Sequence, residues 1–535
     1  MRTRRRPRSL IALGLAAALG LLAGCGSAAT GDSDAEATPV SGGTYVHALE
    51  GEPGCLDPAQ QRYHVALNVA RQTVDSLVDQ DPETGEIVPW IADSWQVSDD
   101  AQTFTFHVRD GATFADGTVI DAAAVKANFD RIAALGTVAV GANPIIQGYV
   151  GTTVVDDATV QIDFDRPNVQ FLQGVSGAWF GLISVADTQR SAEELCSGDY
   201  VGSGPFVFSS YTPQKEVVLT KRVGYDTPSS LADHDGDAYV DELKFLIVTE
   251  ASVRAGSVQS GEVDSASAIA KQDQATLAAA GDDLLSVKIP GLTESVIVNQ
   301  ESWLADDEPV RQALKYAINS QEIVDTIYGD SYSSRIGLLG SSTPYASDFS
   351  DDLAFDLDKA IQLLEDDGWV LGDDGIRVKD GQRLEIDASG ISSYADAELL
   401  QQQWKAAGID VPIVTYDTAA ATEKLSSGDY DIHLWTMTRA DPDLLNAIWN
   451  STRTSFGYAR AVPSSLDDLL LAQAAATDSA ERQELVDQIQ EYLITNAWGF
   501  PVSDRAWVYG LNPTSHGLRL DGETKLVFYD VWKTA

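Results

Sequence analysis

The N-terminus restricts where this chain can fold. It opens with a cluster of positive charge made of Arg2, Arg4, Arg5, Arg6 and Arg8. An apolar run over residues 10–24 follows, and it is shorter than the roughly 20 residues that a helix needs to span a bilayer. A positive segment before a short apolar segment is typical of a secretory signal. We therefore predict that residues 1–24 are a signal peptide and that the protein folds outside the cytoplasm.

The end of the apolar run predicts a lipid anchor. Leu22-Ala23-Gly24-Cys25 resembles the lipobox of bacterial lipoproteins, in which the cysteine is acylated, here with palmitate expected, and becomes the new N-terminus. The alternative is an ordinary signal peptide with a cysteine there by chance. Small and polar residues dominate 25–40, which favours a flexible tether. Because no later run is long enough to span a membrane, we expect Cys25 alone to hold the protein on the outer, periplasmic or extracellular, face of the cytoplasmic membrane.

The charge balance excludes several classes of partner. Asp and Glu number 80 against 36 Lys and Arg, a net charge of -44, and cleavage before Cys25 would remove five arginines and no acid, giving -49. Such a chain repels phosphate backbones and anionic lipid headgroups, so we expect no nucleic acid and no basic membrane patch. Apolar residues at 44% and 11 Trp exclude a disordered chain. At 535 residues, two to four domains are expected.

Two cysteines remain once Cys25 is assigned to lipid. Cys55 and Cys196 would lie in an oxidising compartment, which favours a disulfide between them. Two free buried thiols are the alternative.

Strand and helix patterns alternate along the chain, which predicts a mixed α/β fold. Residues 103–108 alternate with period two, and 154–162 are predicted as two strands around an Asp-rich turn, so both belong to hairpins of a small subdomain. Helices are predicted over 121–135, from Pro309 to a stop at Gly329, and after Asp478. Their apolar stripes are Val125, Phe129 and Ile132; Val310, Leu314, Ala317 and Ile318; Leu485, Ile489 and Leu493.

Motifs of catalysis are absent from the sequence. It has no nucleophile elbow, phosphate-binding loop, dinucleotide fingerprint, Cys-x-x-Cys or His-Glu-x-x-His, and its six histidines are scattered. We therefore expect no enzyme, no cofactor and no metal site. The acidic loop 233–242 could bind calcium, but Gly236 stands at position four of the pattern rather than six, which favours a solvated loop.

Several blocks together resemble one family. They are Pro89-Trp90-Ile91-Ala92-Asp93-Ser94-Trp95, Gly202-Ser203-Gly204-Pro205-Phe206, Ser260-Gly261-Glu262-Val263-Asp264, Val310-Arg311-Gln312-Ala313-Leu314, Gly428-Asp429-Tyr430-Asp431 and Asp441-Pro442-Asp443. In this order they resemble the extracytoplasmic solute-binding lipoproteins of ABC importers, of the dipeptide, oligopeptide and nickel type called family 5. The resemblance covers nearly the whole chain after the tether.

The resemblance implies a two-lobed, periplasmic-binding-protein-like clamshell of the large cluster C type, with a subdomain inserted near the N-terminus. Lobe I would comprise 41–73, 202–289 and 502–535, the insert 74–201, and lobe II 290–501. It also implies a monomer that closes over a small molecule or peptide and delivers it to ABC transporter permease subunits, without catalysis.

The resemblance places the ligand near residues 435–443. Trp435 would form an aromatic wall of the cleft or else belong to the core. Arg439 would hold a carboxylate or phosphate, or else pair with Asp441 or Asp443. Asp441 is itself a further candidate ligand residue. Thr438 stands where peptide receptors of the family carry an Asp that grips the ligand's α-ammonium. A neutral hydroxyl cannot replace that charge-assisted bond, which favours an anionic or polar ligand such as an opine, a modified peptide or a sugar conjugate.

Two further aromatic residues, Trp179 and Tyr63, fall in segments that face the cleft in family members. Chelated nickel is a further possible solute for this family. Two other functions stay open at this point: a sensor lipoprotein of the same fold that presents its ligand to another receptor, and a surface hydrolase.

Overall fold

A computed structural model describes residues 38–61, 63–452 and 457–534. The predicted signal peptide, Cys25 and most of the tether lie outside the described residues. Pro39–Ala535 forms one compact unit. Within the described part of the chain, every helix is too short or too polar to cross a membrane.

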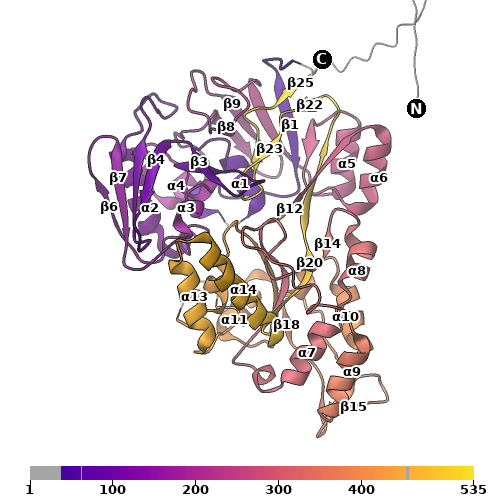
Figure 1. Ribbon diagram of the computed structural model, residues 1–535. Helices are drawn as coiled ribbons and strands as arrows, with labels where there is room; N and C mark the ends of the chain where they lie inside the picture. Colours follow the sequence, from indigo (N-terminus) through magenta and orange to yellow (C-terminus); the bar gives the residue numbers. More distant parts are fainter. Residues whose placement is uncertain (1–37, 62, 453–456, 535) are drawn as a thin grey trace, which may run out of the picture. The chain divides into compact units, whose positions relative to one another are not determined.

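The larger sheet has seven strands, in the order β12, β21, β11, β1, β10, β9, β8. Their bounds are β1 Thr44–Leu49, β8 Phe206–Thr212, β9 Glu216–Lys221, β10 Glu242–Ile247, β11 Ser265–Ala266, β12 Asp283–Lys288 and β21 Ala506–Leu511. Strand β1 runs parallel to both of its neighbours, and the other pairs are antiparallel. Parallel neighbours need crossover connections, and α5 (Ala251–Gln259) connects β10 to β11. With α6 (Lys271–Ala280) it packs beside this sheet (Figure 1).

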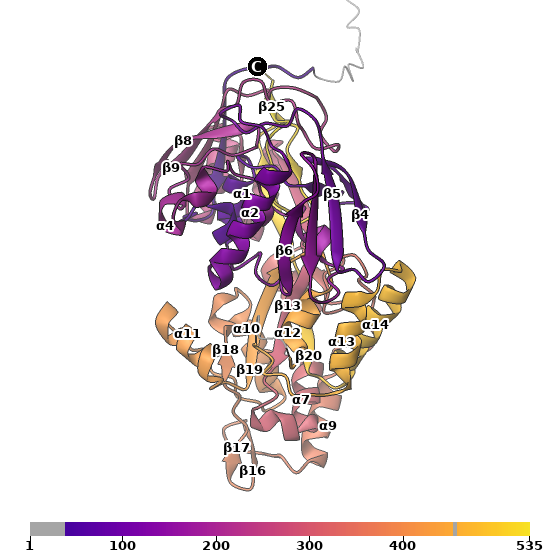
Figure 2. The same ribbon diagram turned by 90° about the vertical axis from the view of Figure 1, so that its left-hand side faces the viewer.

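A second sheet has five strands, in the order β14, β20, β13, β19, β18. Their bounds are β13 Gly291–Val298, β14 Ser333–Ser334, β18 Ala388–Ser389, β19 Ile432–Thr438 and β20 Gly499–Asp504. All residues of β13 are buried, because helices cover the sheet. The helices of this region are η5 Trp303–Asp306, α7 Glu308–Tyr316, α8 Ser320–Ile323, η6 Val324–Tyr328, α9 Leu357–Asp366, η7 Ile391–Ser393, α10 Ala397–Ala406, α11 Thr418–Ser427, α12 Leu444–Trp449, α13 Ser465–Ala475 and α14 Ser479–Thr495. A small hairpin sheet, β15 Val370–Leu371, β16 Arg377–Lys379 and β17 Gln382–Arg383, lies at its outer end (Figure 2).

The chain passes directly from one sheet to the other at two places. Ile289 and Pro290 link β12 to β13, and Arg505 links β20 to β21. This is the two-lobed architecture that the sequence predicted. The predicted division after residue 289 stays a prediction, and the first link lies at Ile289 and Pro290. The predicted division after residue 501 falls inside β20, and the chain leaves that sheet only at Arg505.

The segment between β1 and β8 holds a third, antiparallel sheet in the order β4, β5, β7, β6. Its strands are β4 Ala92–Val97, β5 Thr103–Val108, β6 Tyr149–Val154 and β7 Thr159–Phe164, and α2 (Ala122–Leu135) packs on it. The shorter elements here are η1 Pro58–Gln60, α1 His64–Ala70, β2 Val78–Gln80, β3 Ile87–Pro89, η2 Gly136–Val138, α3 Phe171–Gly174, η3 Ala178–Phe180, η4 Asp187–Gln189 and α4 Ala192–Leu195. Phe171 lies 4.8 Å, centroid to centroid, from both Phe104 and Phe164, so aromatic rings fill this core.

The predicted hairpin strands and two of the predicted helices are confirmed. Asp121 caps α2 by accepting a hydrogen bond from the Ala124 N–H, and Asp478 caps α14 in the same way. The single helix predicted from Pro309 to Gly329 is wrong. Helix α7 ends at Tyr316, and the Asn319 side chain then caps α8, because a short amide side chain competes with the helical backbone.

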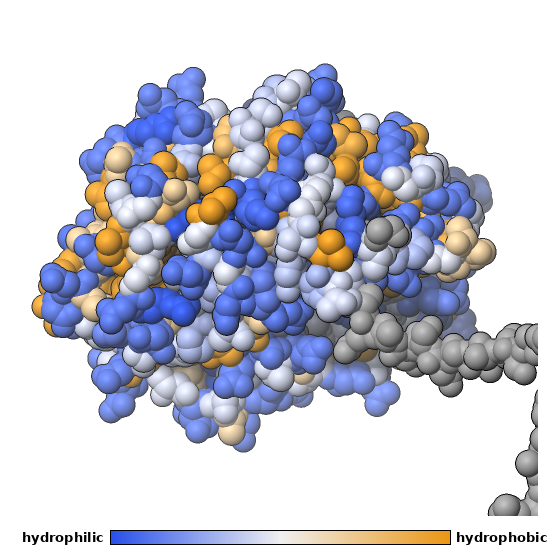
Figure 3. Space-filling view, turned by 90° about the horizontal axis from the view of Figure 1, so that it is seen from above, coloured by the Kyte–Doolittle hydropathy of each residue, from blue (hydrophilic) through white to orange (hydrophobic). Residues whose placement is uncertain are grey.

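The ends of the chain and the cysteines complete the fold. Short strands β22 Ser515–His516, β23 Arg519–Leu520, β24 Leu526–Val527 and β25 Trp532–Lys533 pair beside the large sheet. Cys55 and Cys196 form a disulfide that ties the segment after β1 to the end of α4. Figure 3 shows a face on which hydrophilic residues predominate and apolar residues form small separate groups, as the acid-rich composition leads one to expect.

Candidate functional site

A cavity of about 500 Å³ lies between the two main sheets. The side of the seven-stranded sheet and the insert contributes Tyr63, His64, Leu67, Val140, Gly141, Trp179, Trp507 and Lys525. The five-stranded sheet and its loops contribute Trp435, Thr436, Met437, Thr438 and Tyr458. Arg505, the linking residue between β20 and β21, completes the lining. The volume falls in the range of roughly 300–1,000 Å³ that is typical of small-molecule sites.

Aromatic side chains form much of the wall. The imidazole of His64 stacks on the indole of Trp507 with centroids 4.3 Å apart and an angle of 14° between the planes. Across the cavity, Trp435 meets Tyr458 edge-on at 4.7 Å. The indole N–H of Trp179 donates to the Gln61 carbonyl at 3.0 Å, which fixes its ring. These rings offer flat apolar surfaces that favour a planar or apolar part of a ligand.

The charged groups of the wall are cationic. Lys525 is 2% exposed, and its Nζ donates to the Glu523 carbonyl oxygen at 2.6 Å. Burial, followed by the charges of Lys525 and Arg505, holds the pKa of His64 well below its usual range, so this imidazole is neutral. Its Nε2 lies 3.2 Å from the Tyr509 hydroxyl.

Arg505 also interacts with a buried acidic pair, Glu294 and Asp396. Both carboxyl groups are fully buried. Burial, then the neighbouring Asp396, raises the pKa of Glu294 well above its usual range, while Arg505 opposes this shift. Two adjacent buried carboxyls cannot both ionise at low cost, so the pair retains a proton near neutral pH.

The structure brings four of the predicted ligand residues together. Tyr63, Trp179, Trp435 and Thr438 all line the cavity, and Tyr63 is 60% exposed at its mouth. The other two predicted ligand residues do not line it.

Arg439 and Asp441 lie elsewhere because their side chains have other partners. The Arg439 guanidinium is fully buried and donates, at 3.4 Å each, to Gln170 Oε1 and the Gly141 carbonyl. Asp441 forms a two-bonded ion pair with Arg482, at 2.7 and 2.9 Å.

The other lining residues were not predicted from the sequence, and Arg505, Trp507 and Lys525 are the most consequential of them. Arg505 is the direct link from β20 to β21 and Trp507 follows it in β21, a crossing between sheets that no local pattern in the sequence predicted. Lys525 lies in the C-terminal segment and carries no local signal of a site.

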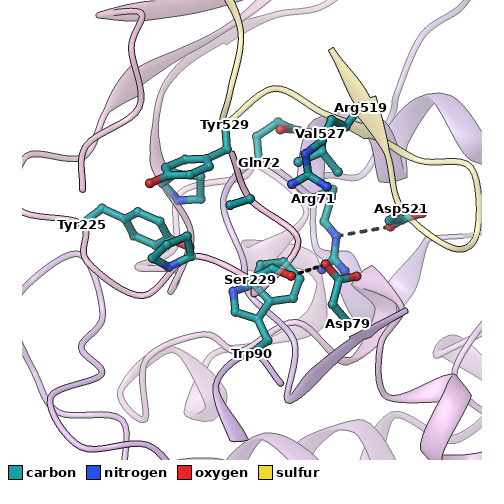
Figure 4. A pocket seen from close by; sticks show the side chains of 13 residues that line it. Arg71, Gln72, Asp79, Trp90, Tyr225, Ser229, Arg519, Asp521, Val527 and Tyr529 are labelled. Carbon is teal, nitrogen blue, oxygen red and sulfur yellow. Dashed lines mark hydrogen bonds and ion pairs between the residues drawn. The ribbon is translucent and has the colours of Figure 1, made fainter. Parts of the chain in front are cut away.

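A second cavity, shown in Figure 4, is too small to hold a solute. Its volume of about 20 Å³ suits one water molecule. Arg71 pairs there with Asp521 at 3.3 Å, and the Ser229 hydroxyl donates to Asp79 at 2.5 Å. These bonds join the insert to the large sheet and its C-terminal segment, so the role of this cluster is structural.

Known proteins are similar to this chain in sequence and in fold. The family model "Bacterial extracellular solute-binding proteins, family 5 Middle" matches residues 86–458. Heme-binding protein A of Haemophilus influenzae is 27% identical, with 94% of this chain and 95% of the relative covered. Di/tripeptide-binding protein 1 of Pseudomonas aeruginosa is 26% identical, with 91% and 93% covered.

Among solved structures, NikA from Brucella suis in complex with Fe(III)-EDTA has a TM-score of 0.78 at 21% identity, with 92% of this chain and 100% of that chain covered. This likeness concerns the fold. Because the family model covers well over half of the sequence, the chain belongs to the bacterial extracellular solute-binding proteins of family 5.

Proposed function

We propose that this protein captures a peptide or peptide-like small polar solute in the cavity and delivers it to the permease subunits of an ABC importer. The observation that carries the proposal is the cavity itself, since residues of both main sheets and of the insert line it. A solute in this position would contact both lobes and would therefore stabilise the closed form over the open one.

Contacts between the lobes support closure as the working motion. Gln170 Nε2 donates to Asp443 Oδ2 at 2.6 Å, and the Val169 N–H donates to the Ala474 carbonyl at 3.1 Å. Figures 1 and 2 agree that the insert and helix α13 lie side by side. Two direct links between the sheets, at Pro290 and Arg505, are suited to a hinge.

The proposal includes attachment to the membrane. Cys25 would carry the lipid, 25–40 would act as a tether, and the protein would work as a monomer at the outer face of the cytoplasmic membrane without catalysing a reaction. Metabolic labelling with palmitate tests this: the wild type should incorporate label, and Cys25→Ser should lose both the label and membrane association. Label retained in Cys25→Ser would contradict the anchor.

Native mass spectrometry of gently purified protein tests solute capture directly. We expect a retained small molecule, whose affinity can then be measured by calorimetry. Trp435→Ala should weaken that affinity at least tenfold, because a central aromatic wall is removed. Trp303→Ala removes a 42% exposed indole outside the cavity and serves as the matched control. Equal affinity in both variants would contradict binding at this site.

Uptake and turnover assays separate the rival functions. Cells that lack this protein should lose uptake of the retained solute. A sensor would bind the solute without affecting its uptake, and a hydrolase would convert it to product.

A further inference from the structure

We infer that the captured solute carries an oxyanion, such as a carboxylate, which Arg505 and Lys525 hold while a flat or aromatic part packs on the ring-lined wall. This inference rests on the proposed function and narrows its substrate class. Acidic residues outnumber basic ones in the chain, 80 to 36. Among the described residues that line the cavity the bias is reversed, with Arg505 and Lys525 present and no Asp or Glu.

Nearby acids leave the charge of Lys525 incompletely balanced. Its Nζ donates to a backbone carbonyl, at Glu523, and carries further N–H bonds that can reach a ligand. The carboxylate of Asp521 is engaged with Arg71 at 3.3 Å. That of Glu523 acts on both Lys525 and the fully buried Arg439. Asp441 and Asp443 also act on Arg439, whereas Asp521 and Glu523, the acids that act on Lys525, each also act on another buried cation, so neither is committed to Lys525 alone. Burial lowers the pKa of Lys525, and these two acids oppose that shift, as an anion bound in the cavity would.

Arg505 is in a similar position. The groups that act on it are the hydroxyls of Tyr332 and Tyr394 and the carboxyl of Glu294. Glu294 is fully buried beside Asp396, so the two share a proton and supply less than their full negative charge. A planar guanidinium at the edge of such a cavity suits two-bonded recognition of a carboxylate.

Neutral donors complete a site for an oxyanion. His64 Nδ1 and Trp507 Nε1 are buried and have no hydrogen-bond partner among the described residues, and both side chains line the cavity. The Tyr509 hydroxyl can donate to His64 Nε2, which places the imidazole proton on Nδ1. A buried N–H without a partner is costly, so each is satisfied best by an acceptor on the solute.

The remaining wall fixes the size and shape of the solute. Trp435, Tyr458 and Trp179 provide rings, and Met437 adds an adaptable apolar contact. A volume of about 500 Å³ has room for a molecule of about dipeptide size. Because no described lining residue is acidic, a free ammonium group would find no charged partner there. The class is therefore an organic anion or an N-blocked peptide acid with at least one ring.

Three matched libraries test the inference. Each contains the same aromatic dipeptides: the first N-acetylated with a free carboxylate, the second N-acetylated with a C-terminal amide, and the third with a free amine and a C-terminal amide. Affinity selection with mass-spectrometric readout should retain members of the acid library about 10- to 100-fold more strongly than their amides, as expected for a charge-assisted pair. Equal retention of acids and amides, preference for the amines, or no retention from any library would overturn the inference.

Variants then assign the discrimination to the two cations. Arg505→Gln and Lys525→Met should each lower the acid-to-amide affinity ratio at least tenfold, whereas a merely structural defect would lower both affinities together and leave their ratio unchanged. Lys288→Gln, which alters a lysine of β12 outside the cavity lining, is the control. An unchanged ratio in both test variants would overturn the assignment. Capture of a neutral solute by native mass spectrometry would refute the inference alone, whereas capture of nothing would refute the proposed function.

Discussion

Asp75 offers the sharpest test of the electrostatics of this fold. It lies between α1 and β2, where the large sheet meets the insert, and it is fully buried. The Tyr225 hydroxyl donates to its Oδ1 at 3.2 Å, while Oδ2 has no partner among the described residues. Burial raises the pKa of Asp75 from 3.8 to about 8, against the opposing charges of Arg222 and Arg71. The folded protein therefore keeps this carboxyl protonated at neutral pH.

The sign and size of the effect follow from linkage. When a carboxyl has a higher pKa in the folded than in the unfolded state, its contribution to stability is fully present only below the pKa of the unfolded state. For Asp75 that contribution is lost as the pH rises from about 4 to about 8. Each pH unit between the unfolded pKa and pH 7 corresponds to about 1.36 kcal/mol. At pH 7, keeping the proton on buried Asp75 therefore lowers the free energy of unfolding by up to about 4 kcal/mol. Asn is neutral at every pH and keeps the acceptor for Tyr225. Asp75→Asn should thus raise the free energy of unfolding by up to about 4 kcal/mol at pH 7, and by little at pH 4.

Urea unfolding of the wild type and Asp75→Asn between pH 4 and pH 8 measures this difference. The gap between the two free energies should widen steadily with pH and level off near pH 8. Other buried acids titrate equally in both proteins, so the difference isolates Asp75. Asp110→Asn, at an exposed site, is the control and should show no such widening. A gap of the same size at pH 4 and pH 8 would refute the reasoning, whatever its sign.

Three other changes test separate parts of the structure. Replacing Cys55 and Cys196 by Ser opens a loop with a sequence separation of 141 and should lower the unfolding free energy by about 4–5 kcal/mol, measured by urea unfolding against the oxidised, disulfide-bonded wild type. Gly202→Ala should destabilise by about 3 kcal/mol, because its Cβ would overlap a backbone carbonyl of the segment after α1, whereas Gly256→Ala, with no neighbour within 4 Å, should not. Arg439→Met should leave calorimetric solute affinity within about threefold, because Arg439 does not line the cavity, and a tenfold loss would make it a ligand residue after all.

N-cap residues and apolar stripes in the sequence predicted the helices in which they occur. Asp121 followed by an apolar stripe gave α2 its start and its buried face, since Val125, Phe129 and Ile132 all lie in the core. The prediction of one helix after Pro309 failed because Ala317 and Ile318, although buried as predicted, lie in a break after α7 rather than in the helix. Apolar periodicity continued across that break, and only the side chain of Asn319 marked it.

The site was less predictable because it is assembled from distant segments. Trp435 and Thr438 were predicted from the resemblance to a family motif, and in the structure both lie within β19. Lys525 reaches the same cavity from a segment that pairs through two-residue strands, and nothing in its neighbours distinguishes it from a surface lysine. Arg439, the more conspicuous cation, turned out to be buried against Gln170 instead. The family resemblance thus located part of the cavity wall, whereas the sources of the cavity's charge depend on tertiary packing.

An acidic surface and a cationic cavity are compatible within one protein. The chain has a net charge of -44. Its exposed charges act on solutes through the salt solution, which screens electrostatic interactions over roughly 8 Å at physiological ionic strength. Lys525 is 2% exposed, so its charge is screened far less and acts on a solute at contact distance. The surface charge therefore governs solubility and the rate of encounter, while Arg505 and Lys525 govern which solute stays. A preference for anions is decided inside the cavity, and the overall charge of the chain is no guide to it.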